Sequence, residues 1–193
     1  MTPERSPERD AAIEAMLPYV EDLGWTVRAL TEAAGPNADL LFAGPVDMVE
    51  AYCDLADRWM TEDAAALDLS ALRVPGRVRA VIAARLARNE PYKEAVRRAL
   101  GVLGLPGRGV VAARCTGRTV SAVWYAAGDA SADFSWYTKR AILAGVYGST
   151  LLYWLRDFSP GSADTLAFLD RRLAGVGRFG KLRARLGRSL RSA

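Results

Sequence analysis

Residues 129–140 are the densest group of side chains that could recognise another molecule. The segment includes two carboxylates, two aromatic rings with a polar group and two cations: Asp129, Asp133, Trp136, Tyr137, Lys139 and Arg140. Aromatic side chains and arginine are enriched at the hot spots of protein interfaces. The alternative is a capped helix with a half-buried Trp and Tyr, and the residue types alone favour neither. If Asp133 caps this helix, Trp136 and Arg140 lie one turn apart on the same face.

Catalytic chemistry has few residues to draw on in this chain. The absence of histidine from all 193 residues excludes Ser-His-Asp triads, zincin helices and imidazole-bound metals. Cys53 and Cys115 lie far apart in separate apolar contexts, which excludes a C-x-x-C redox or zinc site and predicts two buried thiols. We therefore expect no metal and no cofactor, and any enzyme would need other residues. An unrecognised enzyme would have to work with paired carboxylates in a cleft.

Two glycine motifs have the spacing of a dinucleotide fingerprint: Gly175, Gly177 and Gly180, and the alanine variant Gly107, Gly109 and Ala112. The fingerprint needs a preceding strand and an acidic residue about 20 positions later. The first motif instead follows a helical run, and no acidic residue comes after it. Nucleotide binding is therefore not predicted. The first three glycines are expected to loosen the chain before its last segment, because each costs up to ~1 kcal/mol in a helix.

That last segment is basic and amphipathic. Four apolar residues recur at helical spacing within a narrow arc, and no acidic residue follows Asp170. The pattern favours a helix that lies on an anionic membrane, because headgroups attract its cations while the apolar stripe inserts shallowly. The alternative is a docked terminal helix with a solvated basic face. The predicted membrane-binding residues are Arg178, Phe179, Lys181, Leu182, Arg185, Leu186, Arg188 and Leu190.

Composition and periodicity predict an all-α protein. A hydrophobic share of 51% with 25% charged residues is typical of a globular chain, and Pro or Gly interrupts the helical pattern at intervals suited to ordinary helices. The longest charge-free run, residues 141–155, is shorter than the roughly 20 residues that cross a bilayer, and is predicted to be a buried helix. Pro3, Glu4 and Pro7 stand where a secretory signal would be basic and then apolar, so we expect an intracellular protein.

The N-terminal region has the organisation of a helix-turn-helix. An amphipathic helix over residues 8–23 precedes Gly24-Trp25-Thr26, a short helix ends in Ala33-Ala34-Gly35, and another follows at residues 37–42. These landmarks resemble the TetR-type regulators, whose third helix carries Lys, Arg or Tyr for DNA. Here residues 37–44 contain Asp39 and no basic residue, and residues 8–48 carry a net charge of −6. Such a module would repel the phosphate backbone, so we expect the fold without nucleic-acid binding.

Residues 91–173 carry a closer resemblance. The motif G-D-x-S-x-D-F-x-W-Y-x-x-R is present from Gly128 to Arg140. On this motif the chain resembles the accessory family of ubiquinone (coenzyme Q) biosynthesis that is ninth of the Coq series. The resemblance implies a TetR-like fold without DNA binding, an isoprenoid lipid in an apolar cavity, a membrane-associated terminal helix and assistance to the pathway's diiron hydroxylase. It also implies a partner-binding role for the residues at matching positions: Asp129, Ser131, Asp133, Trp136, Tyr137 and Arg140.

We therefore predict a TetR-like bundle of about nine or ten helices in three parts. Residues 1–48 are expected to form a degenerate helix-turn-helix-like module, residues 49–174 a lipid-binding body, and residues 175–193 the basic amphipathic helix. The apolar cavity is expected among the helices of residues 92–169. Its predicted lipid-binding residues are Leu100, Leu103, Trp124, Leu143, Tyr147 and Leu151.

The predicted function is that of a non-catalytic accessory protein of ubiquinone biosynthesis, which presents an isoprenoid quinone precursor to a diiron hydroxylase. We expect a homodimer in the cytoplasm, peripheral on the inner face of the cytoplasmic membrane. The alternative is a TetR-type transcriptional regulator that responds to a small apolar ligand.

Overall fold

The computed structural model describes the backbone of residues 4–128 and 135–189, and their side chains except at 135, 136 and 177–189. Within these ranges the chain forms nine α-helices and four 3-10 helices and contains no strand. The prediction of an all-α fold is confirmed.

The N-terminal module begins with α1 (Pro7–Met16), which passes through a 3-10 turn into α2 (Val20–Leu23). The turn after α2 needs Gly24, whose φ of 69° lies in the left-handed region. Helix α3 (Val27–Ala34) starts at an N-cap, because the Thr26 side chain accepts a hydrogen bond from the Ala29 amide. The third helix of the module is a 3-10 helix, Pro36–Leu41, where an α-helix had been expected.

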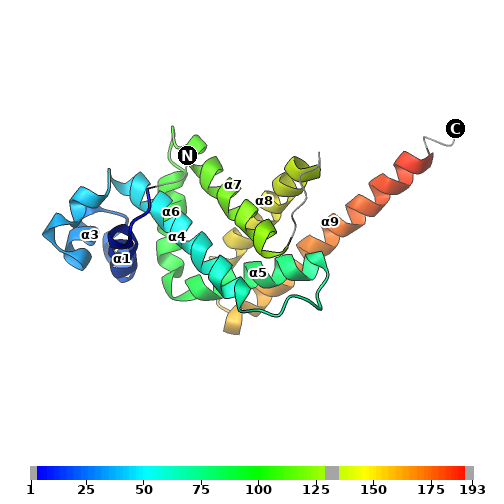
Figure 1. Cartoon of the computed structure of the whole chain (residues 1–193), viewed down its shortest axis with the longest axis horizontal. Helices are drawn as coiled ribbons and strands as arrows, with labels where there is room; N and C mark the ends of the chain where they lie inside the picture. The colour runs from blue at the N-terminus through cyan, green and yellow to red at the C-terminus, as the bar shows by residue number, and fades with distance from the viewer. Residues whose placement is uncertain (1–3, 129–134, 190–193) are drawn as a thin grey trace.

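The body consists of α4 (Pro45–Ala65), α5 (Val74–Asn89), α6 (Lys93–Leu103), α7 (Gly109–Ala126), α8 (Ser135–Trp154) and α9 (Ala163–Ser189). Proline stands in the first turn of α4 and of α5, where its missing amide hydrogen costs nothing. Figure 1 shows α4 running from the N-terminal module into the body, where it lies beside α5 and α7.

Ion pairs and one buried indole fix the module to the body. Trp25 donates its indole hydrogen to the carbonyl of Ala95 on α6 at 2.9 Å and packs beside the Tyr52 ring of α4. Arg58 of α4 makes two hydrogen bonds to Asp10 of α1. The two parts therefore share contacts along α4 from Tyr52 to Arg58.

The two boundaries expected between the three parts of the chain, after residues 48 and 174, fall inside helices. Helix α4 runs through residues 48 and 49, and α9 continues without interruption through residue 175 to Ser189. The expectation that the glycines at 175, 177 and 180 separate a terminal helix from the body is therefore wrong for the backbone. A cost of ~1 kcal/mol for each glycine does not end a helix whose other residues are good helix formers.

Candidate ligand-binding site

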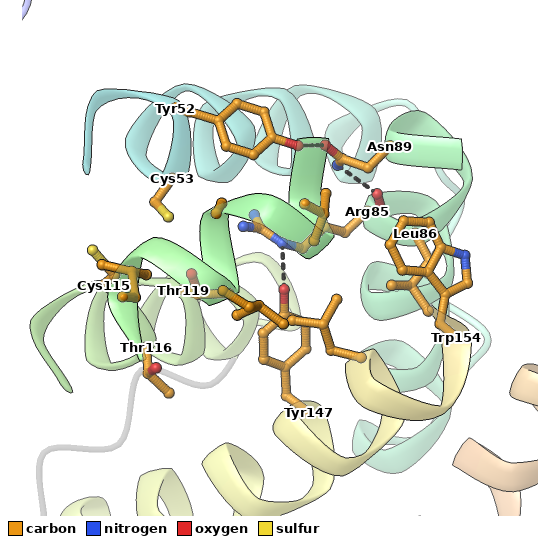
Figure 2. Close-up of a pocket in the computed structure, with 15 residues that line it drawn as sticks. Tyr52, Cys53, Arg85, Leu86, Asn89, Cys115, Thr116, Thr119, Tyr147 and Trp154 are labelled. Atoms are coloured by element: carbon orange, nitrogen blue, oxygen red, sulfur yellow. Dashed lines mark hydrogen bonds between the residues drawn. The ribbon is translucent and has the colours of Figure 1, made fainter. Parts of the chain in front are cut away.

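A core pocket lies where α4, α5, α6, α7 and α8 meet (Figure 2). Its volume is about 80 Å³, and most of its wall is apolar. The lining includes four of the six predicted lipid-binding residues: Leu100, Leu103, Tyr147 and Leu151. The expected range of residues 92–169 was too narrow, because Tyr52 of α4 and Arg85 of α5 also line the pocket.

An apolar groove of about 180 Å³ lies between α5, α7, α8 and α9. The other two predicted lipid-binding residues, Trp124 and Leu143, belong to its lining together with Val78 and Ile142. The indole nitrogen of Trp124 is buried without a hydrogen-bond partner among the described residues. Each hollow taken alone is smaller than the roughly 300–1,000 Å³ of a typical ligand pocket.

The groove and the core pocket follow one another along the same helices. On α8, Leu143 lines the groove and Tyr147, one turn later, lines the core pocket. On α5, Val78 lines the groove and Arg85, two turns later, lines the core pocket. Ile82 of α5 and Val123 of α7 are buried in the same hydrophobic cluster as Leu143 and Tyr147. A chain-like ligand that occupied both hollows would therefore displace mainly apolar contacts.

A charged cluster is buried beside the core pocket. Arg85 forms an ion pair with Asp57 of α4 at 2.6 Å, and both side chains are less than 10% exposed. Thr119 of α7 donates to the same Asp57 oxygen at 2.8 Å, and Arg85 Nε donates to the Tyr147 hydroxyl of α8 at 2.8 Å. We call Asp57, Arg85, Thr119 and Tyr147 the polar cluster; it joins four helices through side chains.

The electrostatics of the polar cluster keep Arg85 charged. Burial alone would lower the pKa of Arg85, but the nearby Tyr147 and Asp57 raise it above its ordinary value. Burial raises the pKa of Asp57 and that of Tyr147, against the opposing attraction of Arg85. A second polar contact lies across the pocket from Tyr147, where Tyr52 donates to the Asn89 side-chain oxygen at 2.5 Å (Figure 2).

The two cysteines, expected in separate apolar surroundings, meet on the wall of this pocket. Both are free thiols; Cys115 is buried and Cys53 half-buried. The hydrogen bond that Cys53 donates to Cys115 lowers the pKa of Cys115, and the positive charge of the nearby Arg118 guanidinium lowers it further. The same hydrogen bond, together with burial, raises the pKa of Cys53.

Sequence reasoning missed the polar cluster and Asn89, although the sequence held a signal for them. Asp57 follows Cys53 by four residues and therefore lies on the apolar face of α4. Arg85 and Asn89 follow Val78 and Ile82 along the apolar face of α5 in the same way. A charged residue at a core position of a helical pattern costs free energy unless it is paired, so it points to a buried partner.

The predicted partner surface is described only in part. Tyr137 is 75% exposed at the start of α8, and Arg140 Nε donates to Ser121 of α7 at 3.2 Å. The backbone of Asp129, Ser131 and Asp133 and the side chain of Trp136 lie outside the described residues.

The predicted membrane-binding residues are not described as side chains. The side chains from Arg178 to Arg188, and the whole of Leu190, lie outside the described residues. Within the described ranges, no helix has the length and apolar character needed to cross a membrane.

The cations of the N-terminal module are engaged in internal contacts. Arg9 is 6% exposed, lies over the Phe42 ring and pairs with Asp47 at 2.8 Å. Arg28 pairs with Glu32 one turn along α3. These contacts leave little positive charge for a phosphate backbone, so the module is still predicted not to bind nucleic acid.

Comparison with known proteins identifies relatives of the chain. The family model described as COQ9 matches residues 110–180. The ubiquinone biosynthesis protein COQ9, mitochondrial, of Xenopus tropicalis is 32% identical over 175 residues, which are 84% of this chain and 55% of that protein. COQ9-B of Xenopus laevis is 33% identical over 84% of this chain and 60% of its own length. The human COQ9 protein is 40% identical over 96 residues, half of this chain and 30% of that protein.

A solved structure shares the fold. The TetR transcriptional regulator from Nitrosomonas europaea ATCC 19718 superposes with a TM-score of 0.70 over 88% of this chain and 97% of its own. The sequence identity is 22%, so this likeness concerns the fold alone. The predicted TetR-like architecture is confirmed.

The expected location is contradicted by the relatives. We expected a cytoplasmic protein on the inner face of the cytoplasmic membrane, whereas the COQ9 proteins of Xenopus and the probable coq9 protein of Dictyostelium discoideum are named mitochondrial. That expectation relied on the residues near the N-terminus of the given sequence. The chain spans only 55–60% of the length of the Xenopus proteins. The resemblance noted from the motif at residues 128–140 is confirmed, and the chain is a relative of the COQ9 proteins on a TetR-like helical fold.

Proposed function

We propose that the chain is a non-catalytic, lipid-binding accessory protein of ubiquinone biosynthesis, which binds an isoprenoid quinone precursor and presents it to a diiron hydroxylase at a membrane. A role in ubiquinone biosynthesis is supported by the names of the COQ9 relatives. The observation that carries the lipid-binding part is the alignment of the core pocket and the apolar groove along α5, α7 and α8. An isoprenoid tail suits this path, because its branched hydrocarbon chain needs apolar contact along its whole length.

Native lipid extraction tests this proposal. Mass spectrometry of lipid extracted from the purified chain is expected to detect an isoprenoid quinone precursor. Ile142→Glu is expected to remove most of it, because this change places a charge on the wall of the groove. Ile142 is already 43% exposed, so the protein should still fold.

Val27→Glu provides the matched control. Val27 is 44% exposed on α3, in the N-terminal module, and does not line the groove. An equal lipid content in the wild type, Ile142→Glu and Val27→Glu would contradict binding in the groove. Extracts without isoprenoid would contradict the lipid-binding function.

We also propose that the surface formed by Asp129, Ser131, Asp133, Trp136, Tyr137 and Arg140 docks the hydroxylase. The exposure of Tyr137 supports this assignment, since aromatic anchors of an interface are accessible before the partner binds. The match of the family model over residues 110–180 covers all six positions.

Tyr137→Ala and Trp136→Ala are each expected to weaken the pull-down of the hydroxylase by about 20-fold or more, because truncation of a central aromatic anchor costs ~2 kcal/mol or more. Tyr19→Ala is the control: it removes an exposed tyrosine of the N-terminal module. Equal retention of the partner by all three variants would refute the docking surface. A large loss of melting temperature in Trp136→Ala would assign that side chain to the core instead.

Two further parts of the proposal concern assembly. The basic half of α9 is proposed to bind an anionic membrane surface, which the sequence pattern after residue 175 supports. A homodimer is proposed as the oligomeric state. The rival function, a ligand-responsive transcriptional regulator, is supported by the fold alone, and the paired cations of the N-terminal module weigh against it.

A further inference from the structure

Cys53 of α4 and Cys115 of α7 form a pair of free thiols on the wall of the core pocket. Figure 2 shows their sulfur atoms at the same end of the pocket, turned toward each other. The Cys53 thiol donates a hydrogen bond to the Cys115 sulfur, across the interface where α4 packs against α7. Two thiols that already contact each other are the starting arrangement for a disulfide.

A neighbouring cation makes the two thiols chemically unequal. Arg118, one turn after Cys115 on α7, places its Nη2 atom 3.6 Å from the Cys115 sulfur. The same guanidinium donates to the side chain and to the carbonyl of Glu50 on α4, each at 3.2 Å, which holds it in place. A guanidinium beside a thiol stabilises the thiolate, which is the form that attacks oxidants. The hydrogen bond from Cys53 and the charge of Arg118 lower the pKa of Cys115, against the opposing effects of burial and of Glu50.

Cys53 keeps its proton instead. Its hydrogen bond to Cys115 and its burial raise the pKa of Cys53, and the Asp57 carboxylate one turn later on α4 adds to this effect. The charge of Arg85 on α5 acts in the opposite direction. Cys115 is therefore the attacking thiol of the pair, and Cys53 is the thiol placed to react second.

The pocket admits only a small reactant to these thiols. Cys115 is 4% exposed, so a reactant reaches it through the pocket volume of about 80 Å³. A water molecule occupies roughly 30 Å³ in the liquid, so the pocket has room for hydrogen peroxide but not for glutathione. Hydrogen peroxide also carries no charge that would have to be desolvated in an apolar pocket.

We propose that Cys53 and Cys115 are an oxidisable dithiol, which hydrogen peroxide converts into a disulfide between α4 and α7. The Cys115 thiolate attacks one peroxide oxygen, so that an S–O bond forms and the O–O bond breaks. The released hydroxide takes up the proton that the Cys115 thiol had lost and leaves as water.

Cys53 completes the reaction. Its sulfur attacks the sulfur of the Cys115 sulfenic acid, so that the S–S bond forms and the S–O bond breaks. The proton of Cys53 leaves with the hydroxide as a second water. The two thiols lose two electrons in total, and these electrons reduce the peroxide. The inference goes beyond the proposed function and names no ligand for the pocket.

Intact-mass spectrometry of the full chain tests the proposal. The reduced protein is treated with a small excess of hydrogen peroxide and then alkylated with N-ethylmaleimide under denaturing conditions. We expect the untreated chain to take up two maleimides, and the oxidised chain to take up none and to weigh two hydrogen atoms less. Because the chain has two cysteines in all, a disulfide within one chain joins Cys53 to Cys115. Two maleimides on the peroxide-treated chain, or a disulfide between two chains, would overturn the proposal.

Substitution of each cysteine by serine separates the two roles. Cys53→Ser is expected to stop at the sulfenic acid of Cys115, which dimedone traps and mass spectrometry detects. Cys115→Ser is expected to react with peroxide about tenfold more slowly than Cys53→Ser, because the remaining thiol has no guanidinium beside it. Faster oxidation of Cys115→Ser would contradict the assigned order of attack.

Arg118→Gln tests the part played by the guanidinium. It is expected to slow formation of the disulfide about three- to tenfold. Arg114→Gln is the matched control, since Arg114 donates twice to the same Glu50 carboxylate and makes no hydrogen bond to the Cys115 sulfur within the described part of the chain. Equal rates in the wild type and both variants would overturn the activation of Cys115 by Arg118. If Arg118→Gln folds poorly, the wild-type reaction and the serine variants still decide the proposal.

Glutathione disulfide is the control oxidant. It is expected to leave both thiols of the native chain unmodified over the time in which hydrogen peroxide forms the disulfide. A glutathione adduct on either cysteine at a similar rate would show that solvent reaches the thiols directly, and would overturn access through the pocket.

Discussion

Asp57→Ala is expected to lower the free energy of unfolding by about 3–5 kcal/mol, the cost of leaving a buried charge without its partner. The change removes the carboxylate that pairs with Arg85 at 2.6 Å and that accepts from Thr119, inside a region where both charged side chains are less than 10% exposed. Arg85 cannot escape by losing its proton, because arginine stays protonated in proteins. Urea or guanidinium denaturation of the purified variant measures the loss.

The matched control is Asp63→Ala, on the same helix. Asp63 pairs with Arg88 of α5 at 2.8 Å, but these side chains are 28% and 40% exposed. Water screens such a pair, so its loss is expected to cost about 1 kcal/mol or less. Similar losses for the two variants would show that Arg85 reaches solvent when its partner is removed, and that the polar cluster is not sealed.

Local signals in the sequence predicted the helices well. Gly24 was predicted to end the first helical region and Pro45 to open a long helix, and both positions agree with the structure, because each boundary depends on residues close to it in sequence. The third helix of the module was predicted as α-helical and is a 3-10 helix of six residues. Gly35 at φ 93° and Pro36 start this segment, and the few residues that remain before the next turn leave it short.

The apolar part of the site was predictable, whereas its polar part was not. Leu100, Leu103, Tyr147 and Leu151 all line the core pocket because helical periodicity places them inward. The pairs Asp57 with Arg85 and Cys53 with Cys115 depend instead on how α4 packs against α5 and α7. Periodicity indicates which face of a helix is buried, but it does not identify the residue that meets it across the interface.

Ending the chain after Gly175 is expected to abolish binding to anionic vesicles while the body stays folded. The truncation removes six cations, Arg178, Lys181, Arg183, Arg185, Arg188 and Arg191, together with the apolar stripe that begins at Phe179. Each cation near an anionic surface contributes about 1 kcal/mol, so the loss should reach several orders of magnitude in the partition coefficient. Vesicle sedimentation with phosphatidylserine-rich membranes measures this change.

The first half of α9 should remain in place after the truncation, because its anchors come before the cut. Leu169 is fully buried, Thr165 donates to Asp157 from both its amide and its hydroxyl, and Asp170 pairs with Arg79. The melting temperature of the truncated chain is therefore expected to stay near that of the full chain.

A full-length variant with Arg178, Lys181 and Arg185 changed to glutamine separates charge from helix length. It is expected to bind phosphatidylserine-rich vesicles about 100-fold more weakly, and wild-type binding should weaken as salt rises because partly exposed charges are screened. Arg171→Gln is the control, since this cation lies before the cut with its guanidinium over the Phe168 ring. If the terminal segment is instead docked on the body, truncation will lower the melting temperature and leave vesicle binding unchanged, and the membrane assignment will be wrong.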